Sequence, residues 1–385
     1  MARRRWAVLA AGTVAQTSQA AAYSGLAVLA PFLRDRYHLS VTQVGVLLGG
    51  ASVGAVLTLL FWGLLADHIG ERTTATIGLL GCGAGFAASA FAPEFTSLVV
   101  ILAVASAFGA SSNSATGRAV TSWFPQAQRG FALGVRQTAI PIGGFAAAVA
   151  MPPVADAGGA RAALLALAGL SIVAGLVAAA WLVEGPRHAG EPGAAASLVH
   201  PLRDRRIWRL SVGSSLLIVT QTTVTGFVVL FLESQHDFSP GGAGAVLAAM
   251  NVFGAAGRLL SGRLSDRSGS RLVLIRRLAI GAALATGAAS ALTGASGWLV
   301  VPALVLGGGL SMSWNALAVT AVVEATGARR TGAALGLQQT VLGVAVAAAP
   351  VAFAPFVSAT SWRAGFAVAA GFPLAAVGVL RSLGR

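Results

Sequence analysis

Long apolar runs follow one another along the whole sequence, separated by short segments that carry most of the charged residues. An α-helix rises 1.5 Å per residue, so about 20 apolar residues cross the ~30 Å hydrocarbon layer of a membrane. Twelve runs reach about this length. We therefore predict twelve membrane-spanning helices, at residues 7–32, 43–66, 74–93, 96–121, 131–154, 160–183, 207–232, 241–264, 272–293, 297–321, 332–357 and 362–381.

The composition supports a membrane protein. Of the 385 residues, 56% are hydrophobic and only 10% are charged. A water-soluble chain of this length needs a more polar surface. The sequence is thus typical of an all-α, multi-pass protein whose main partner is the lipid bilayer.

A ten-residue charged turn occurs twice, which indicates an internal duplication. Residues 63–72 read GLLADHIGER and residues 262–271 read GRLSDRSGSR, so that Gly, Leu, Asp, Gly and Arg recur at the same offsets. Residues 132–138 likewise recur at 334–340. We predict two pseudo-symmetric six-helix bundles, 1–183 and 207–385, joined by a cytoplasmic linker, 184–206, whose second part is either an interfacial helix or a plain tether.

The net charge of +14 comes entirely from arginine, since the sequence has no lysine. With the N-terminus inside, twenty arginines fall on the cytoplasmic side and four outside, which is the positive-inside pattern. The charge therefore reflects topology and argues against a nucleic-acid partner. We expect both termini in the cytoplasm, in a bacterial inner (cell) membrane, and a monomeric protein.

The repeated turn resembles the signature of the major facilitator superfamily of secondary transporters. That signature, Gly-x-Leu-x-Asp-x-x-Gly-x-Arg, lies between the second and third helices and here has a second copy between the eighth and ninth. Residues 129–143, and the spacing of Arg258 from Gly262, are also similar to the monocarboxylate and oxalate/formate porters. The resemblance implies a twelve-helix fold and transport by alternating access around a central site.

Two arginines fall deep inside predicted spanning helices. Arg258 lies eight residues before Asp266, about 12 Å from the turn, and Arg136 lies seven residues after Arg129, about 10 Å in. An arginine at the bilayer centre costs roughly 2.5–3.5 kcal/mol on insertion scales, so such residues are usually functional. We expect both to face the central site and to bind an anion through forked hydrogen bonds. The alternative is that each pairs with a backbone carbonyl or supports its bundle.

Uncharged polar side chains gather on the same helices, where such groups join helices or line a wet cavity. Those that we assign to substrate binding, besides the two arginines, are Gln19, Tyr23, Asn113, Gln137, Gln221, Asn251, Asn315, Gln338 and Gln339.

The repeated turns are predicted gates. A carboxylate at a helix end pairs with arginines and with the N-terminus of the next helix, and so holds helix ends together in one state. The gating residues that we predict are Gly63, Asp67, Gly70, Arg72, Gly262, Asp266, Gly269 and Arg271. Glu324 is a candidate to join them, and the alternative is that these charges only set topology.

Several chemistries have no sequence signal. No carboxylate falls clearly in a helix centre, no Gly-rich phosphate loop with Lys is present, and no catalytic triad or metal-ligand spacing is visible. We therefore expect no enzyme activity, no cofactor and no metal. The favoured function is antiport or symport of a small organic anion. The alternatives are export of a drug-like or secondary-metabolite amphiphile and, less favoured, a transport-dead membrane sensor.

Overall fold

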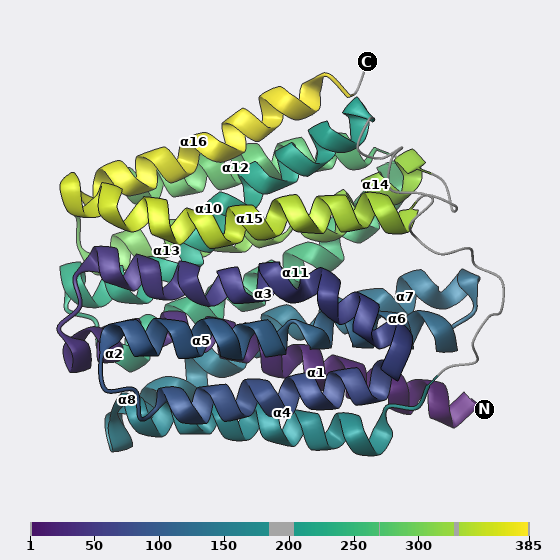
Figure 1. The fold of residues 1–385 in the computed structure, drawn as a ribbon. Coiled ribbons are helices and arrows are strands. Elements are labelled where there is room, and N and C mark those ends of the chain that lie inside the picture. The colour runs from purple at the N-terminus through teal and green to yellow at the C-terminus, as the bar shows by residue number, and fades with distance from the viewer. Residues whose placement is uncertain (1, 185–203, 269, 327–330, 384–385) are drawn as a thin grey trace. The chain divides into compact units, whose positions relative to one another are not determined.

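The computed structural model describes residues 2–184, 204–268, 270–326 and 331–383, and the regular structure in these ranges is entirely helical (Figure 1). The chain divides into two compact units, Met1–Ala189 and Gly190–Arg385. The all-α prediction is confirmed. Of the predicted linker, 184–206, only residues 184 and 204–206 are described, and the rest lies outside the described ranges.

The described part of the first unit has eight helical segments. Their bounds are α1 Ala2–Val28, α2 Ala30–Tyr37, α3 Val41–Ile69, α4 Glu71–Ser89, α5 Phe95–Gly109, α6 Ser111–Trp123, α7 Gln126–Gln137 and α8 Ala139–Trp181. The second unit has seven described segments. These are α10 Arg205–His236, α11 Pro240–Ser268, α12 Arg271–Ala291, α13 Gly297–Met312, α14 Asn315–Thr326, α15 Thr331–Ala359 and α16 Trp362–Arg381.

Some predicted spans are interrupted within their length. The short helix α2 begins at Ala30 after a break at Leu29, and its second residue, Pro31, has no N–H to donate to the preceding helix. The predicted spans 96–121 and 297–321 each consist of two helices, interrupted at Ala110 and at Ser313–Trp314. The duplicated helices thus break at equivalent places in the two units.

Helix α8 contains two crossings. Its 43 residues would extend about 65 Å, twice the thickness of the hydrocarbon layer. Gly159, with φ 70° and ψ 179°, interrupts the helical conformation between the predicted spans 131–154 and 160–183. Nine of the described helical stretches meet a strict length and hydropathy criterion for spanning a membrane, and α8 is counted once among them. The count of twelve is consistent with this arrangement.

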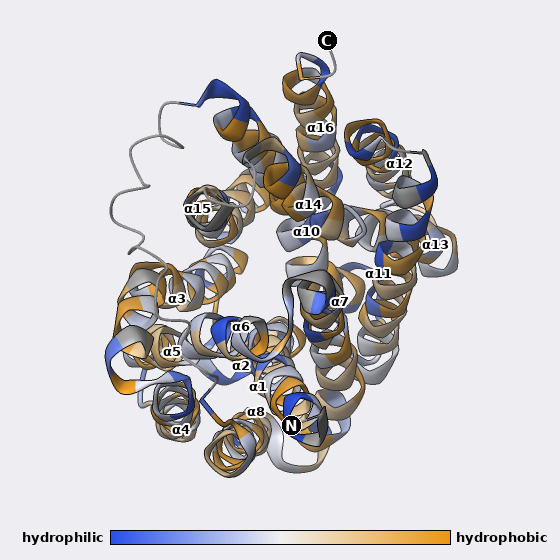
Figure 2. Ribbon diagram, turned by 90° about the vertical axis from the view of Figure 1, so that its right-hand side faces the viewer, coloured by the Kyte–Doolittle hydropathy of each residue, from blue (hydrophilic) through white to orange (hydrophobic). Residues whose placement is uncertain are grey.

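The interior combines many buried alanines with large buried side chains such as Phe227 and Trp314, and other large apolar side chains are exposed. Ala15, Ala115 and Ala174 form part of a buried cluster between α1, α6 and α8. By contrast, Leu284 is 70% exposed and Trp298 79%. Hydrophobic residues run along the helices of both units (Figure 2). A surface of this kind is stable against lipid tails and not against water.

Candidate functional site

Arg136 lies on α7 and is held by neutral groups of its own unit. Its Nη2 donates to Gln16 Oε1 of α1 at 2.8 Å and to Asn113 of α6, reaching Oδ1 at 2.8 Å and the backbone oxygen at 2.9 Å. Its Nε donates to Thr116 Oγ1 at 2.9 Å. The residue is only 4% exposed. Two other helices, α1 and α6, therefore fix the orientation of this guanidinium.

Arg258 lies on α11 and is half-buried. Its Nε donates to the backbone oxygen of Met312 at 2.8 Å. Met312 is the last residue of α13, where carbonyls have no partner inside the helix, so the arginine caps the broken tenth helix. Ser261, one turn further along α11, donates to the next carbonyl, that of Ser313, at 3.0 Å.

Close packing of α11 on α13 brings Arg258 to this break. A Cβ added at Gly254 would lie 2.8 Å from Met312 Cβ, and one added at Gly257 would lie 3.0 Å from Ser313 Cβ. Only glycine leaves room for these approaches. Each embedded arginine thus contacts a backbone carbonyl of its own unit, which is the structural role that the sequence left open as the alternative.

The two arginines nevertheless keep their charge and some of their donors. Neither guanidinium lies within 4.0 Å of a carboxylate in the described part of the chain. Among the described residues, Nη1 of Arg136 and both Nη atoms of Arg258 have no hydrogen-bond partner. A buried or partly buried cation without a counter-charge favours a nearby anion.

Other predicted binding residues split into two groups. The first group makes hydrogen bonds within its own unit. Gln19 accepts a hydrogen bond from Ser112. Asn251 donates to Leu247 of its own helix at 2.9 Å, and Gln338 donates to Ser214 at 3.1 Å. Asn113 belongs with Arg136, as described above.

The remaining predicted binding residues make few hydrogen bonds to described neighbours. Tyr23 is 37% exposed on α1, and its hydroxyl is hydrogen-bonded with Ser52. The side chains of Gln137, Asn315 and Gln339 are partly buried and make no hydrogen bond to described residues. The amide oxygen of Gln221 is buried without a described partner. None of these five side chains hydrogen-bonds to Arg136 or Arg258 in the described part of the chain.

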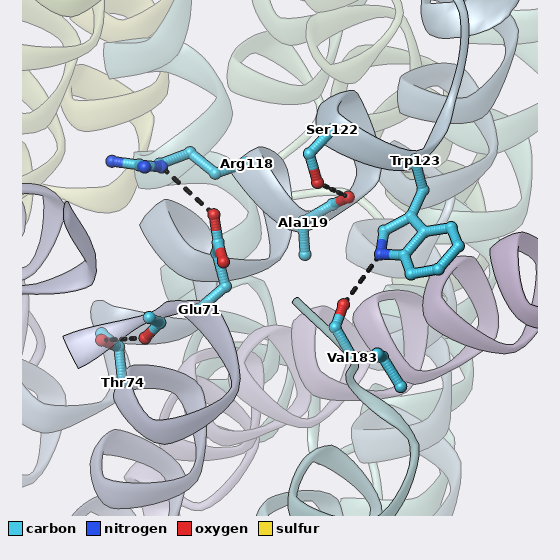
Figure 3. Close-up of polar contacts among 8 residues, drawn as sticks. Glu71, Thr74, Arg118, Ala119, Ser122, Trp123 and Val183 are labelled. Atoms are coloured by element: carbon cyan, nitrogen blue, oxygen red, sulfur yellow. Dashed lines mark hydrogen bonds and ion pairs between the residues drawn. The ribbon is translucent and has the colours of Figure 1, made fainter. Parts of the chain in front are cut away.

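The first charged turn is tightly built (Figure 3). Gly70 adopts φ 87° and ψ 160°, links α3 to α4, and accepts a hydrogen bond from Thr74 Oγ1 at 2.7 Å. A Cβ at Gly70 would overlap the Glu184 carboxylate. Glu71, the first residue of α4, forms an ion pair with Arg118 of α6 at 3.7 Å. Arg72 is exposed.

A side-chain hydrogen bond also joins segments at the same end of the first unit. The indole Nε1 of Trp123, the last residue of α6, donates to the Val183 backbone oxygen at 2.8 Å (Figure 3). The segment after α8 is thus attached to the end of α6. The Glu71–Arg118 pair joins α6 to α4 in the same region.

The second charged turn also carries an ion pair, but the acidic and basic residues have exchanged helices relative to the first turn. Arg271, the first residue of α12, pairs through Nε with Glu324 Oε1 of α14 at 3.1 Å and donates through Nη1 to Ser265 Oγ at 3.0 Å. The duplication relates α12 to α4 and α14 to α6. The basic partner therefore lies on α6 in one unit and on α12 in the other.

Three predicted gating residues cannot be placed. Gly269 and the side chains of Asp67 and Asp266 lie outside the described part of the structure. Gly63 and Gly262 are described, and a Cβ at either would meet no atom of its own unit within 4 Å. Local packing in this conformation does not require those two glycines.

A comparison with known families decides the identity of this fold. The family model of the Major Facilitator Superfamily matches residues 12–350, most of the chain. The chain belongs to the Major Facilitator Superfamily. It is therefore an integral, multi-pass membrane transporter and not an enzyme.

Named relatives of this superfamily member include transporters of anions. It is 31% identical, over 97% of its length and 84% of the relative's, to an uncharacterized MFS-type transporter of Mycobacterium tuberculosis. It is 32% identical to the hexuronate transporter of Bacillus subtilis over 31% of this chain and 29% of that one. It is 26% identical to a probable sulfoacetate transporter of Cupriavidus necator, over 93% and 88%.

Solved structures show the same fold. A bacterial homolog of the human lysosomal transporter Spinster, in an inward-facing and unoccupied conformation, matches with a TM-score of 0.82 at 16% identity. The match covers 98% of this transporter and 96% of that chain.

Two features of the arginine sites were not predicted from the transporter's sequence. Thr116 accepts from Arg136 Nε, and its position one turn after Asn113 was the available signal, because residues three apart share a helix face. Nothing in the sequence indicated that the Met312 carbonyl would be free to accept a hydrogen bond from Arg258. The sequence around it, SMSWN, contains no proline that would predict a broken helix.

Proposed function

We propose that this transporter moves small organic anions across the membrane by alternating access, and that Arg136 and Arg258 supply the positive charge that the substrate needs. One observation carries the proposal: neither of two membrane-embedded guanidiniums has a carboxylate partner in the described residues. Each unbalanced cation is costly in a membrane. A substrate anion lowers that cost while it is bound.

The two arginines differ in how many of their N–H groups remain for a substrate. Arg258 uses only Nε on the protein, so its two Nη groups remain for a forked contact with a carboxylate or sulfonate. Arg136 uses Nε and Nη2 on neutral acceptors, which fix its position and leave Nη1. A preorganised donor binds an anion at a smaller entropic cost than a mobile one.

The relatives support the same substrate class. Hexuronate and sulfoacetate, after which two of them are named, are both organic anions. We extend to this chain only that shared chemistry. The cytoplasmic location of both termini, the gating role of the repeated turns and the monomeric state remain part of the proposal.

A thermal-shift screen of the purified protein tests the substrate class. A ligand that binds only the folded state raises the melting temperature. We expect a hexuronate or sulfoacetate to raise it, and a neutral hexose and a hydrophobic cation to leave it unchanged. Arg258→Gln should abolish the shift. Arg263→Gln, an exposed arginine on the same helix, should retain it.

The opposite result favours an alternative function. If hydrophobic cations raise the melting temperature and the organic anions do not, export of amphiphiles becomes the better proposal. If the anions act equally on wild type and Arg258→Gln, Arg258 is a structural cap of α13 only.

A further inference from the structure

A second cation-lined site lies within the second unit, away from Arg258. Where α10 and α12 begin and α14 and α16 end, the structure contains a cavity of about 270 Å³. Three arginines line it: Arg206 of α10 and Arg271 and Arg276 of α12. Among the described lining residues, Glu324 of α14 supplies the one carboxylate. The charged side chains of these residues sum to +2 at neutral pH.

The surplus charge belongs to Arg206 and Arg276. Arg271 is engaged by Glu324 and by Ser265. The side chains of Arg206 and Arg276 have no ion pair or hydrogen bond to the residues that the structure describes. Two guanidiniums on the wall of one cavity repel each other, and an anion between them removes that repulsion.

The first turn of α12 adds neutral donors to the same wall. Ser270, Arg271, Leu272 and Val273 all line the cavity, and the Ser270 side chain does not cap the helix. The first N–H groups of a helix have no partner within it and carry a partial positive charge. A helix N-terminus combined with arginines is a common phosphate-binding arrangement.

The remaining wall is apolar. Leu210, Ala325 and Leu383 contribute to it. The cavity also lies at the ends of spanning helices, which is where lipid headgroups meet a membrane protein. A ligand with a phosphate joined to an apolar portion matches both kinds of wall better than a free ion does.

We propose that this cavity, which we call the α12 pocket, binds the phosphate of an anionic phospholipid. The site is separate from the proposed substrate site and stands whether or not the transporter carries organic anions. Free inorganic phosphate shares the recognition chemistry and is the competing source of the ligand.

Thermal shifts of the purified full-length protein distinguish these cases. Phosphatidylglycerol should raise the melting temperature by about 2 °C more than phosphatidylcholine once it exceeds its dissociation constant tenfold. Arg206→Gln with Arg276→Gln should remove this difference. Arg205→Gln with Arg277→Gln, exposed neighbours on the same two helices that do not line the cavity, should keep it.

The proposal is overturned if both double variants lose the difference equally, because the effect is then general surface charge. It is also overturned if inorganic phosphate alone produces the shift and phosphatidylglycerol adds nothing.

A second test uses only the wild-type protein, so it still applies if a variant does not fold. Phenylglyoxal modifies accessible arginines, and peptide mass spectrometry reads each position separately. Phosphatidylglycerol should protect Arg206 and Arg276 at least threefold more than Arg205 and Arg277. Equal protection of all four arginines, or none, contradicts a built phosphate site.

Discussion

Arg136 and Arg258 occupy unlike surroundings although both are cations inside predicted spanning helices, Arg136 being buried and Arg258 half-buried. Arg136 donates to acceptors from two other helices, and Arg258 donates once, to the end of α13. The two side chains therefore respond differently to the same substitution. A guanidinium that serves several acceptors at fixed angles is not replaced by a lysine, which is a single compact charge.

Arg258→Lys should weaken anion binding less than Arg258→Gln. Lysine keeps the charge but cannot cap Met312 and fork to a ligand at once. A hydrogen bond to a charged group contributes about 1.5–3 kcal/mol, so we expect roughly a tenfold loss of affinity for lysine and a larger loss for glutamine. Titration of the thermal shift with a hexuronate measures both. Equal affinities in all three proteins would remove Arg258 from the binding site.

Thr116→Val should loosen Arg136 without removing a charge. Valine has nearly the shape of threonine but no acceptor for Nε, so we expect a loss of about 1–3 kcal/mol in stability and weaker anion binding. Thr13→Val is the matched control, because among the described residues the Thr13 hydroxyl bonds only to Leu9 of its own helix, at 2.8 Å. Melting curves of both variants check this. Comparable effects at the two positions would make Thr116 an ordinary helix residue.

At the scale of single residues, the sequence allowed the embedded charged side chains to be predicted but not the groups to which they donate hydrogen bonds. Arg136 and Arg258 were found because arginine is rare and costly inside an apolar run. Their contacts were harder to foresee. Threonine is common in membrane helices, and a carbonyl acceptor depends on where a helix ends rather than on a side chain.

At the scale of helices, interruptions distinguish this bundle from twelve straight rods. The fourth and tenth helices break at Ala110 and at Ser313–Trp314, and the tenth break supplies the carbonyl that Arg258 caps. Broken helices occur in transporters where freed backbone groups face a partner other than lipid. Hydropathy predicted the spans because it measures apolar length. It could not predict the breaks, since apolar residues continue through them.

The turn between α3 and α4 gives a prediction for a single helix junction. Gly70, at φ 87° and ψ 160°, has a conformation open almost only to glycine. Gly70→Ala should therefore cost about 1–3 kcal/mol and lower the melting temperature. Gly63→Ala is the control: Gly63 is helical and a Cβ there is unopposed within its unit, so alanine should be neutral or stabilising by up to ~1 kcal/mol. Equal melting temperatures for both would show that the turn does not need glycine.

At the scale of the whole molecule, the duplication predicts paired but unequal units. The ion pairs Glu71–Arg118 and Arg271–Glu324 join equivalent helices with reversed charge, and Arg136 has the neutral Gln338 as its counterpart. A polar, asymmetric substrate requires such differences between related halves. The repeat could be read from ten residues, whereas the exchange of charges between α4 and α12 required the folded units.

The repeated aspartates test the proposed gates. Asp67→Asn or Asp266→Asn should leave the protein folded but change the balance between its inward-open and outward-open states about tenfold, because each would lose the charge-assisted contact of ~1–3 kcal/mol that the gate proposal assigns to it. Reactivity of single cysteines introduced near the two ends of the helices reports this balance. Unchanged reactivity together with unchanged transport would reduce both turns to topology signals.

The most direct test of organic-anion transport is the uptake of a labelled hexuronate or sulfoacetate into proteoliposomes. Wild-type protein and Arg263→Gln should give saturable uptake. Arg258→Gln should fall at least tenfold at equal amounts of inserted protein, as the loss of one charged contact implies. Wild-type uptake by Arg258→Gln, or binding of these anions with no flux in the wild-type protein, would contradict the account.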